Sequence, residues 1–311
     1  MTVLIDPARW PAHGTVFSHL VSDSSLEELH GFAAAAGISP RAFDGDHYDV
    51  PVERYRQLVA LGAEEVSGAE LVRRLVASGL RIPAAQRPGK LDKILTQRFN
   101  RLFPGTSPLE REPVVTDLLT RWSEPHRHYH DRSHLLAVLK GIDLLLRHGE
   151  DCGRWTRSVK LAAWFHDAVY RGDPQRPAGQ DEEDSAVLAE RTLDELGLPH
   201  AEIEQTARLV RMTAAHAPDP EDRAGAVLSD ADLEVLGRGR GDYARYLAAV
   251  RDDFAHVPDA DFAAGRAAVV QSLLEKRPLY RTATGARLWE RAARRNLSAE
   301  LHPSHFPGRD H

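Results

Sequence analysis

The sequence predicts two domains, a small α/β domain followed by an all-α helical domain, and three observations support this. The chain has 311 residues, 42% hydrophobic and 28% charged, which is ordinary for a globular protein and long enough for two domains. Short apolar runs alternate with helical segments before the Pro- and Gly-rich break at 83–90, and helical periodicity dominates from Leu91 to Leu301. We therefore predict a first domain at 1–86, a linker and connecting helix at 87–111, a helical domain at 112–302 and a tail at 303–311.

In the first domain, the expected strands and helices alternate at short intervals. The Ser25–Glu28 capping box opens one helix, and Ser67 caps another. The remaining signals are a buried strand at 3–6, a short strand at 38–43, a turn or loop at 44–49, a helix between Pro51 and Gly62, and a short strand near Glu65. This alternation favours a mostly parallel sheet.

The second domain repeats apolar residues at three- and four-residue intervals, as amphipathic helices do. No segment between Leu91 and Leu301 has a convincing strand pattern, and we expect about eight helices. The clearest segments are 135–146, 156–169, 184–196, 201–213, 244–254 and 266–275.

Charge, hydropathy and cysteine content exclude several classes of protein. The net charge is −6 and neither part of the chain is basic, so we expect no nucleic-acid partner. No apolar run is long enough to span a membrane, and the first residues lack the pattern of a signal peptide, which favours a cytoplasmic location without a membrane partner. The one cysteine, Cys152, rules out an internal disulfide and a Cys-rich zinc finger.

Three separated segments of the helical domain are rich in histidine and aspartate, in a chain with 16 histidines. They are HRHYHDRSH at 126–134, WFHDAVY at 164–170 and LSDADLEVLG at 228–237. Taken singly, they also suit a solvated loop, a hydrogen bond on a helix face and a capping turn. Imidazole and carboxylate together suit a divalent transition metal, and the adjacent His166–Asp167 pair is expected inside an apolar helix, where an unpaired charge is costly.

The order His, His-Asp, Asp resembles the HD superfamily of metal-dependent phosphohydrolases. SHLLAVL, WFHDAVY and SDADLEVLG are similar to its three motifs, so the resemblance implies that His134, His166, Asp167 and Asp232 bind one divalent metal. A bacterial branch of predicted HD phosphohydrolases is similar over about residues 112–302. That resemblance rests on PHRHYH, AAWFHDAVY, EEDSA (182–186), the VP…F…GR run (257–266), RPLYRT (277–282) and ARRNL (293–297).

Several assignments stay open within this resemblance. His130 lies four residues before His134 and would share its helix face, whereas Asp230 and Asp232, two residues apart, cannot point the same way. We favour His134 and Asp232 as ligands, because each stands next to the apolar turn as in the family, and we expect Asp230 to be a cap. His216 lies between the His-Asp pair and the last aspartate, and it is compatible with a helix-end residue, a residue that orients phosphate or water, or a ligand of a second metal.

Other candidates are supported less directly. Glu182 and Glu183 could orient water or a ligand imidazole, or could simply favour a helix N-terminus. Arginine suits phosphate oxygens, so basic residues near the motifs are candidates for substrate binding, although each could be an ordinary surface charge. These basic residues are Arg127, Arg132, Lys160 and Arg171.

The first domain resembles a small bacterial domain family of unknown function. The resemblance rests on WPAHG, FSHLVSDSSLEELH and FDGDHYDVP, and it implies no activity. Several polar residues in these segments could line a shared pocket or serve as turns and caps. These residues are His13, His19, Asp23, Asp46 and His47.

The function that these observations favour is metal-dependent hydrolysis of a phosphate ester in a nucleotide-like small molecule. Asp167 would bind the metal and help orient the attacking water, and Glu182 and Glu183 would assist catalysis. The cofactor would be a divalent cation, one of Mn, Co, Ni, Fe, Zn or Mg, and the oligomeric state stays open. The alternatives are a di-iron HD-type oxygenase and a non-catalytic nucleotide-sensing HD module.

Overall fold

The computed structural model describes residues 2–12, 14–81, 88–173 and 175–301. The chain forms two compact units, Met1–Leu91 and Asp92–His311, which we call the α/β unit and the helical unit. The predicted order, a small α/β region followed by a helical region, is confirmed. The expected boundary at residue 86 and the expected tail at 303–311 lie outside the described residues.

The sheet of the α/β unit is mostly antiparallel, so the expectation of a mostly parallel sheet is wrong. Its strands are β1 (Val3–Ile5), β2 (Trp10–Ala12), β3 (Thr15–Ser22), β4 (Tyr48–Pro51) and β5 (Glu64–Glu65). β3 is antiparallel to β1, β2 and β4, and within the described residues β1 and β5 form the one parallel pair. A physical reason is the short link between β2 and β3, because two residues can join antiparallel strands but not parallel ones.

Three helices cover the two faces of this sheet: α1 (Leu26–Ala35), α2 (Val52–Ala60) and α3 (Gly68–Ala77). As expected, the hydroxyl groups of Ser25 and Ser67 accept hydrogen bonds from backbone N–H groups in the first turns of α1 and α3. Leu29 of α1 and Leu58 of α2 pack with Ile5 and Leu20 on one face. On the other face, α3 supplies Leu71 and Leu75, which pack against Leu4 and Val21.

Two further sequence predictions in this unit differ from the structure, one wholly and one in part. The expected strand at 38–43 is a 3₁₀ turn, η1 (Pro40–Ala42), because Pro40 has no N–H to donate to a sheet and the Ser39 hydroxyl caps the turn. The segment expected as a loop at 44–49 includes the start of β4, which pairs with β3.

The helical unit contains ten α-helices within its described residues, rather than about eight, and no strand is present there. They are α4 (Pro88–Asn100), α5 (Pro108–Arg121), α6 (Arg132–Arg147), α7 (Thr156–Phe165), α8 (Gln180–Glu195), α9 (His200–Thr213), α10 (Arg223–Asp232), α11 (Arg240–Asp253), α12 (Asp259–Glu275) and α13 (Ala283–Glu300). One helix that periodicity did not single out is α10. It has ten residues and is buried almost all round, so its sequence carries no apolar stripe.

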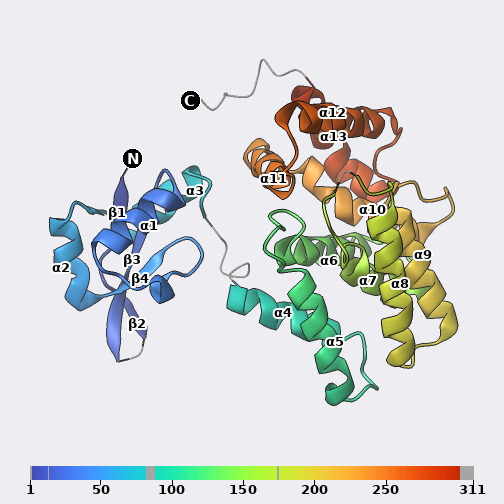
Figure 1. Ribbon diagram of the computed structural model, residues 1–311, viewed down its shortest axis with the longest axis horizontal. Helices are drawn as coiled ribbons and strands as arrows, with labels where there is room; N and C mark the ends of the chain where they lie inside the picture. Colours follow the sequence, from blue (N-terminus) through green and yellow to red (C-terminus); the bar gives the residue numbers. More distant parts are fainter. Residues whose placement is uncertain (1, 13, 82–87, 174, 302–311) are drawn as a thin grey trace. The chain divides into compact units, whose positions relative to one another are not determined.

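Helices α6, α7 and α10 meet at the centre of the helical unit, and α8 and α9 form an antiparallel hairpin beside them (Figure 1). Gly141 of α6 lies against Ala231 of α10, so these two backbones approach closely. Buried aromatic residues fill the core, and the indole N–H of Trp122 donates to the carbonyl oxygen of Trp164 at 3.0 Å. None of the described helices is both long and apolar enough to cross a membrane.

Candidate metal centre and pocket

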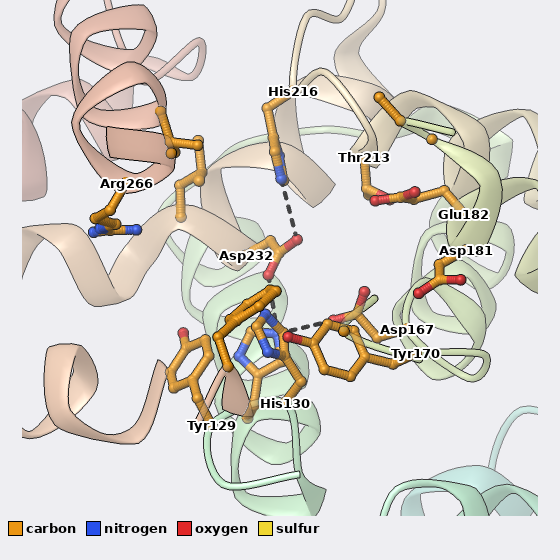
Figure 2. Close-up of a pocket in the computed structure, with 18 of the residues that line it drawn as sticks. Tyr129, His130, Asp167, Tyr170, Asp181, Glu182, Thr213, His216, Asp232 and Arg266 are labelled. Carbon is orange, nitrogen blue, oxygen red and sulfur yellow. Dashed lines mark ion pairs between the residues drawn. The ribbon is translucent and has the colours of Figure 1, made fainter. Parts of the chain in front are cut away.

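A pocket of about 800 Å³ lies where α6, α7 and α10 meet. Two histidines and two aspartates lie together there, and we call them the four-residue cluster: His134, His166, Asp167 and Asp232. His134, Asp167 and Asp232 line the pocket, whereas His166 is buried and does not belong to its lining. The walls of the pocket come from the segment before α6, the starts of η4 (Leu233–Gly237) and α8, and parts of α11 and α12 (Figure 2).

The four side chains, predicted from three separate motifs, lie together. The Nε2 atoms of His134 and His166 are 3.2 Å apart. Asp232 Oδ1 is 3.1 Å from His134 Nε2 and 3.6 Å from His166 Nε2. Asp167 Oδ2 is 3.1 Å from His166 Nε2 and 3.8 Å from His134 Nε2. Both imidazole nitrogens therefore lie within 4 Å of a carboxylate oxygen of each aspartate, and His134, His166 and Asp167 each offer one ligand atom within 4.8 Å of the others.

Local backbone structure positions both histidines of the cluster. The Asp131 carboxylate caps α6 by accepting hydrogen bonds from the N–H groups of Ser133 and His134. α7 ends at Phe165, so His166 is the residue after the helix, and the expectation of a His-Asp pair inside a helix is wrong. His166 Nδ1 donates to the carbonyl oxygen of Ala163 at 2.9 Å, which turns Nε2 towards the cluster.

In the four-residue cluster, the imidazole and carboxylate groups shift one another's pKa. Burial lowers the pKa of His166, but the carboxylates of Asp167 and Asp232 outweigh it and raise that pKa well above its usual range. Burial raises the pKa of both aspartates, yet the neighbouring imidazoles hold each pKa below its ordinary value. Both aspartates therefore favour their ionised form next to a positive charge. Either protons on the imidazole rings or a metal cation can supply that charge.

His130 and His134 both line the pocket but have different partners. His130 Nδ1 donates to Asp253 Oδ2 at 2.7 Å, and its ring stacks on Tyr170. Asp253 also accepts hydrogen bonds from the backbone N–H groups of residues 128–130. This buried carboxylate at the end of α11 therefore positions the whole histidine-rich segment, and sequence reasoning missed it because it lies 123 residues from His130.

Asp230 and Asp232 point in different directions, as their spacing requires. Asp230 is fully buried outside the pocket lining and accepts hydrogen bonds from the backbone N–H groups of Arg281 and Thr282 and from the Thr282 hydroxyl. It thereby fixes the start of α13. Asp232 is the last residue of α10 and faces the pocket.

His216 follows the end of α9 with a left-handed backbone, φ +46°, which is uncommon for a residue other than glycine. Its Nε2 lies 3.6 Å from Asp232 Oδ2, on the other carboxylate oxygen from His134 (Figure 2). Burial lowers the pKa of His216, which favours the neutral form that ligates metals. His216 Nδ1 lies 3.3 Å from the Ser229 hydroxyl, and the backbone carbonyl oxygens of Ala215 and His216 accept hydrogen bonds from Lys276.

Only one of the two glutamate candidates lines the pocket. Glu182 lines the pocket, and burial raises the pKa of its carboxyl group. Glu183 does not line the pocket; its carboxylate pairs with Arg211 at 2.7 Å. We therefore withdraw Glu183 as a catalytic candidate.

None of the four predicted basic residues lines the pocket. Arg127 is buried and donates to the carbonyl oxygens of His130, Asp167 and Ala168, so it holds the turn that carries Asp167. Each of the other three contacts a carboxylate group. Arg132 pairs with Asp92, Lys160 pairs with Asp143, and the backbone N–H of Arg171 donates to Asp181.

The basic residues that line the pocket are Arg176 and Arg266. Arg266 of α12 pairs with Glu300 at 2.7 Å and donates to the Tyr246 hydroxyl at 2.9 Å. Arg176 pairs with Asp181 and Asp184. The Gly265–Arg266 pair in the VP…F…GR run was a sequence signal for Arg266, whereas Arg176 gave none.

Residues 3–78 match a family described as "Protein of unknown function (DUF4031)". This match agrees with the predicted resemblance of the first domain to a family of unknown function, and it covers less than half of the chain. No curated protein and no solved structure matches the chain.

The polar residues that were candidates for a pocket in the α/β unit differ in their surroundings. Asp23 is structural: its carboxylate accepts hydrogen bonds from the backbone N–H of Thr2 and from Arg74. His13 lies outside the described residues. His19 and His47 belong to a separate cluster considered below, and Asp46 contacts the ring of His47.

Proposed function

We propose that the helical unit is an HD-type metal-dependent phosphohydrolase that acts on a phosphate ester of a nucleotide-like small molecule. The observation that carries this proposal is the four-residue cluster at the pocket. The five distances that join an imidazole Nε2 atom of this cluster to another of its ligand atoms are 3.1–3.8 Å, close to the separation of about 3.4 Å between ligands with 2.0–2.1 Å bonds to a tetrahedral metal ion.

The donor set fits a divalent transition metal. His134 and His166 would offer Nε2 atoms, and Asp167 and Asp232 would offer carboxylate oxygens. Bound there, a divalent cation lowers the pKa of a coordinated water and polarises a phosphoryl oxygen. The pocket is also lined by five carboxylates and two arginines, so a phosphate would be repelled unless a cation compensates.

The chain's own residues provide the remaining functions of a hydrolase site. Asp253 keeps a proton on His130 Nδ1, so His130 Nε2 is the nitrogen available to hold or accept a proton in the pocket. Glu182 lines the pocket, and its carboxyl group, whose pKa burial raises, is the candidate for proton transfer to or from the substrate. Arg266 has a fork-shaped cation at the pocket wall that suits phosphate oxygens.

The wall beside the cluster is apolar, which supports a substrate with a flat or hydrophobic part. Leu233, Val235 and Leu236 follow Asp232 directly, and Phe254 and Leu273 come from neighbouring segments. Such a wall with a few polar groups at one end is typical of small-molecule sites. We infer that the phosphate lies near the four-residue cluster and the remainder of the molecule lies against this wall.

His216 favours a second candidate, a two-metal site of the kind that di-iron oxygenases use. Asp232 lies between His134 on one oxygen and His216 on the other, so it could bridge two ions. Metal content distinguishes the two candidates. Two ions in the helical unit that fall to one in His216→Ala, with iron and oxygen uptake, would favour the oxygenase, whereas one ion in the helical unit of both proteins favours the phosphohydrolase.

The test is a screen of the full chain against phosphorylated metabolites, with Mn²⁺, Co²⁺, Ni²⁺, Mg²⁺, Fe²⁺ and Zn²⁺ in parallel. We expect phosphate release that His166→Ala and Asp167→Asn reduce at least 100-fold, together with loss of bound metal measured by mass spectrometry. His200→Ala is the matched control, because His200 is exposed on α9. Equal metal content in the wild type and both cluster variants would refute the proposal, and bound metal without turnover on any substrate would favour the sensing module.

A further inference from the structure

A second group of histidines and aspartates lies on the sheet of the α/β unit. We call His19, His47 and Asp49 the sheet cluster. His19 of β3 and Asp49 of β4 are direct cross-strand partners, so their side chains share one face of the sheet. His47 immediately precedes β4, and its ring lies edge-on to the His19 ring, with centroids 4.9 Å apart.

Both imidazole rings present the same nitrogen to Asp49. His47 Nε2 is 3.4 Å and His19 Nε2 is 3.9 Å from Asp49 Oδ1. One potential ligand atom from each of the three residues lies within 4.8 Å of the others. Two imidazole nitrogens and one carboxylate form a common ligand set for a divalent transition metal.

A further carboxylate orients each ring from behind. His19 Nδ1 lies 3.0 Å from Asp6 Oδ2, and His47 Nδ1 lies 2.6 Å from Asp46 Oδ1. Metal-ligating histidines usually donate the N–H of their other ring nitrogen to a carboxylate or carbonyl group in this way, which fixes the tautomer with Nε2 as the ligand. Two histidines in one small sheet both show this arrangement.

The fold keeps these two carboxylates away from solvent. Asp6 is 4% exposed and Asp46 is fully buried. A Cβ atom at Gly68, the first residue of α3, would lie 3.3 Å from Asp6 Oδ2, so the glycine lets the helix pass close to that carboxylate. Burial of charge is costly unless partners compensate, and here the compensating partners include the two imidazole rings.

From this geometry we propose that the α/β unit binds one divalent transition-metal cation of the Zn²⁺ class through His19, His47 and Asp49. His47 Nε2 and Asp49 Oδ1 already lie at the separation of about 3.4 Å expected around a tetrahedral ion, and the other ligand atoms, all within 4.8 Å of one another, would move closer on binding. Asp49 is 46% exposed and His19 is 24% exposed, so solvent can reach an ion held by these three ligands. This site is independent of the function proposed for the helical unit.

The experiment uses the full chain with His166→Ala and Asp167→Asn, which removes the metal ligands proposed in the helical unit. Zn²⁺ titration by calorimetry is expected to show one site per chain. Adding His47→Gln should abolish that binding, and adding Asp49→Asn should weaken it at least tenfold. Adding His30→Gln is the matched control, because His30 lies in the same unit and its Nδ1 contacts the Tyr48 hydroxyl instead of a carboxylate.

Two further measurements make the result specific. Asp6→Asn removes an orienting carboxylate without removing a ligand, so Zn²⁺ affinity should fall about 10- to 100-fold. Co²⁺ should quench the fluorescence of Trp10, whose exposed ring lies 5.3 Å from the His19 ring, and the quenching should disappear in Trp10→Phe. Circular dichroism of each metal-free variant identifies any that fails to fold, and Asp49→Asn, at a half-exposed position, is the variant that tolerates substitution best.

Absence of Zn²⁺ binding in the folded background protein, or binding that His47→Gln and Asp49→Asn leave unchanged, would overturn the proposal. The cluster would then be a set of ion pairs between imidazolium and carboxylate groups. Retained Zn²⁺ binding with no activity in the helical unit would contradict only the function proposed above, so the two failures are distinguishable.

Discussion

At the four-residue cluster, a proton and a metal cation compete for the same imidazole nitrogen. Burial alone would keep His166 neutral, but Asp167 and Asp232 raise its pKa well above its usual range when no metal is bound. A metal must displace that proton, so we expect apparent affinity to fall as pH falls, beginning above pH ~6.5 and approaching tenfold per pH unit. Zn²⁺ or Mn²⁺ titrations between pH 6 and 8 measure this dependence.

The same shift predicts opposite pH trends for the stability of the two forms. Because the pKa of His166 is higher in the folded than in the unfolded chain, protonation stabilises the metal-free fold at low pH, and this contribution is lost as pH rises through the folded pKa. The metal-loaded form gains stability over the same range, because metal binds the unprotonated ring. Thermal melts with and without chelator test this, and parallel pH trends would contradict the assignment of His166 as a ligand.

Among the elements, the contact between α6 and α10 sets how closely His134 and Asp232 approach. Gly141 of α6 permits this contact, because a Cβ atom there would lie 3.1 Å from Ala231 Cβ and 3.2 Å from two Ala231 backbone atoms. Gly141→Ala should therefore separate the helices. We expect a net loss of about 1–2 kcal/mol in the free energy of unfolding, since overpacking outweighs the better helix propensity of alanine, and weaker metal binding.

The matched control for this prediction is Gly241→Ala in α11. A Cβ atom at Gly241 would meet only the end of the Arg245 side chain, at 3.9 Å, so this change should stabilise the protein by about 0.5–1 kcal/mol through helix propensity. Chemical denaturation and metal titration of both variants provide the comparison. If Gly141→Ala behaves like Gly241→Ala, the α6–α10 contact does not set the geometry of the cluster.

For the whole molecule, the two units should fold separately. The two core clusters of the α/β unit are drawn from residues between Val3 and Leu80, and the four-residue cluster lies entirely within the helical unit. A chain of residues 88–311, which begins at the first residue of α4, should therefore melt cooperatively and keep the metal binding of the four-residue cluster. An insoluble or metal-free fragment, beside an intact full-length protein, would show that the units depend on each other.

Local signals in the sequence determined much of the order of elements. The Ser25–Glu28 and Ser67 caps, and the apolar periodicity from Leu91 onward, are formed by residues a few positions apart, so they can be recognised without a structure. The motifs also singled out His134, His166, Asp167 and Asp232, although not that His166 follows the end of α7. What the motif order could not supply is the geometry that brings these four side chains together.

Partners that are distant along the chain were decided by tertiary structure alone. The antiparallel sheet depends on pairing between β3 and β4, which places His19 opposite Asp49, thirty residues away. Arg127 is close to the motifs in sequence, but its side chain donates hydrogen bonds to backbone carbonyl groups. Arg266 and Asp253 come from helices that are distant in sequence, and Arg266 lines the pocket while Asp253 contacts His130. Helix caps and apolar periodicity arise from residues within one or two helical turns. Strand register and the partners of charged groups depend instead on which surfaces pack together, and no short segment contains that information.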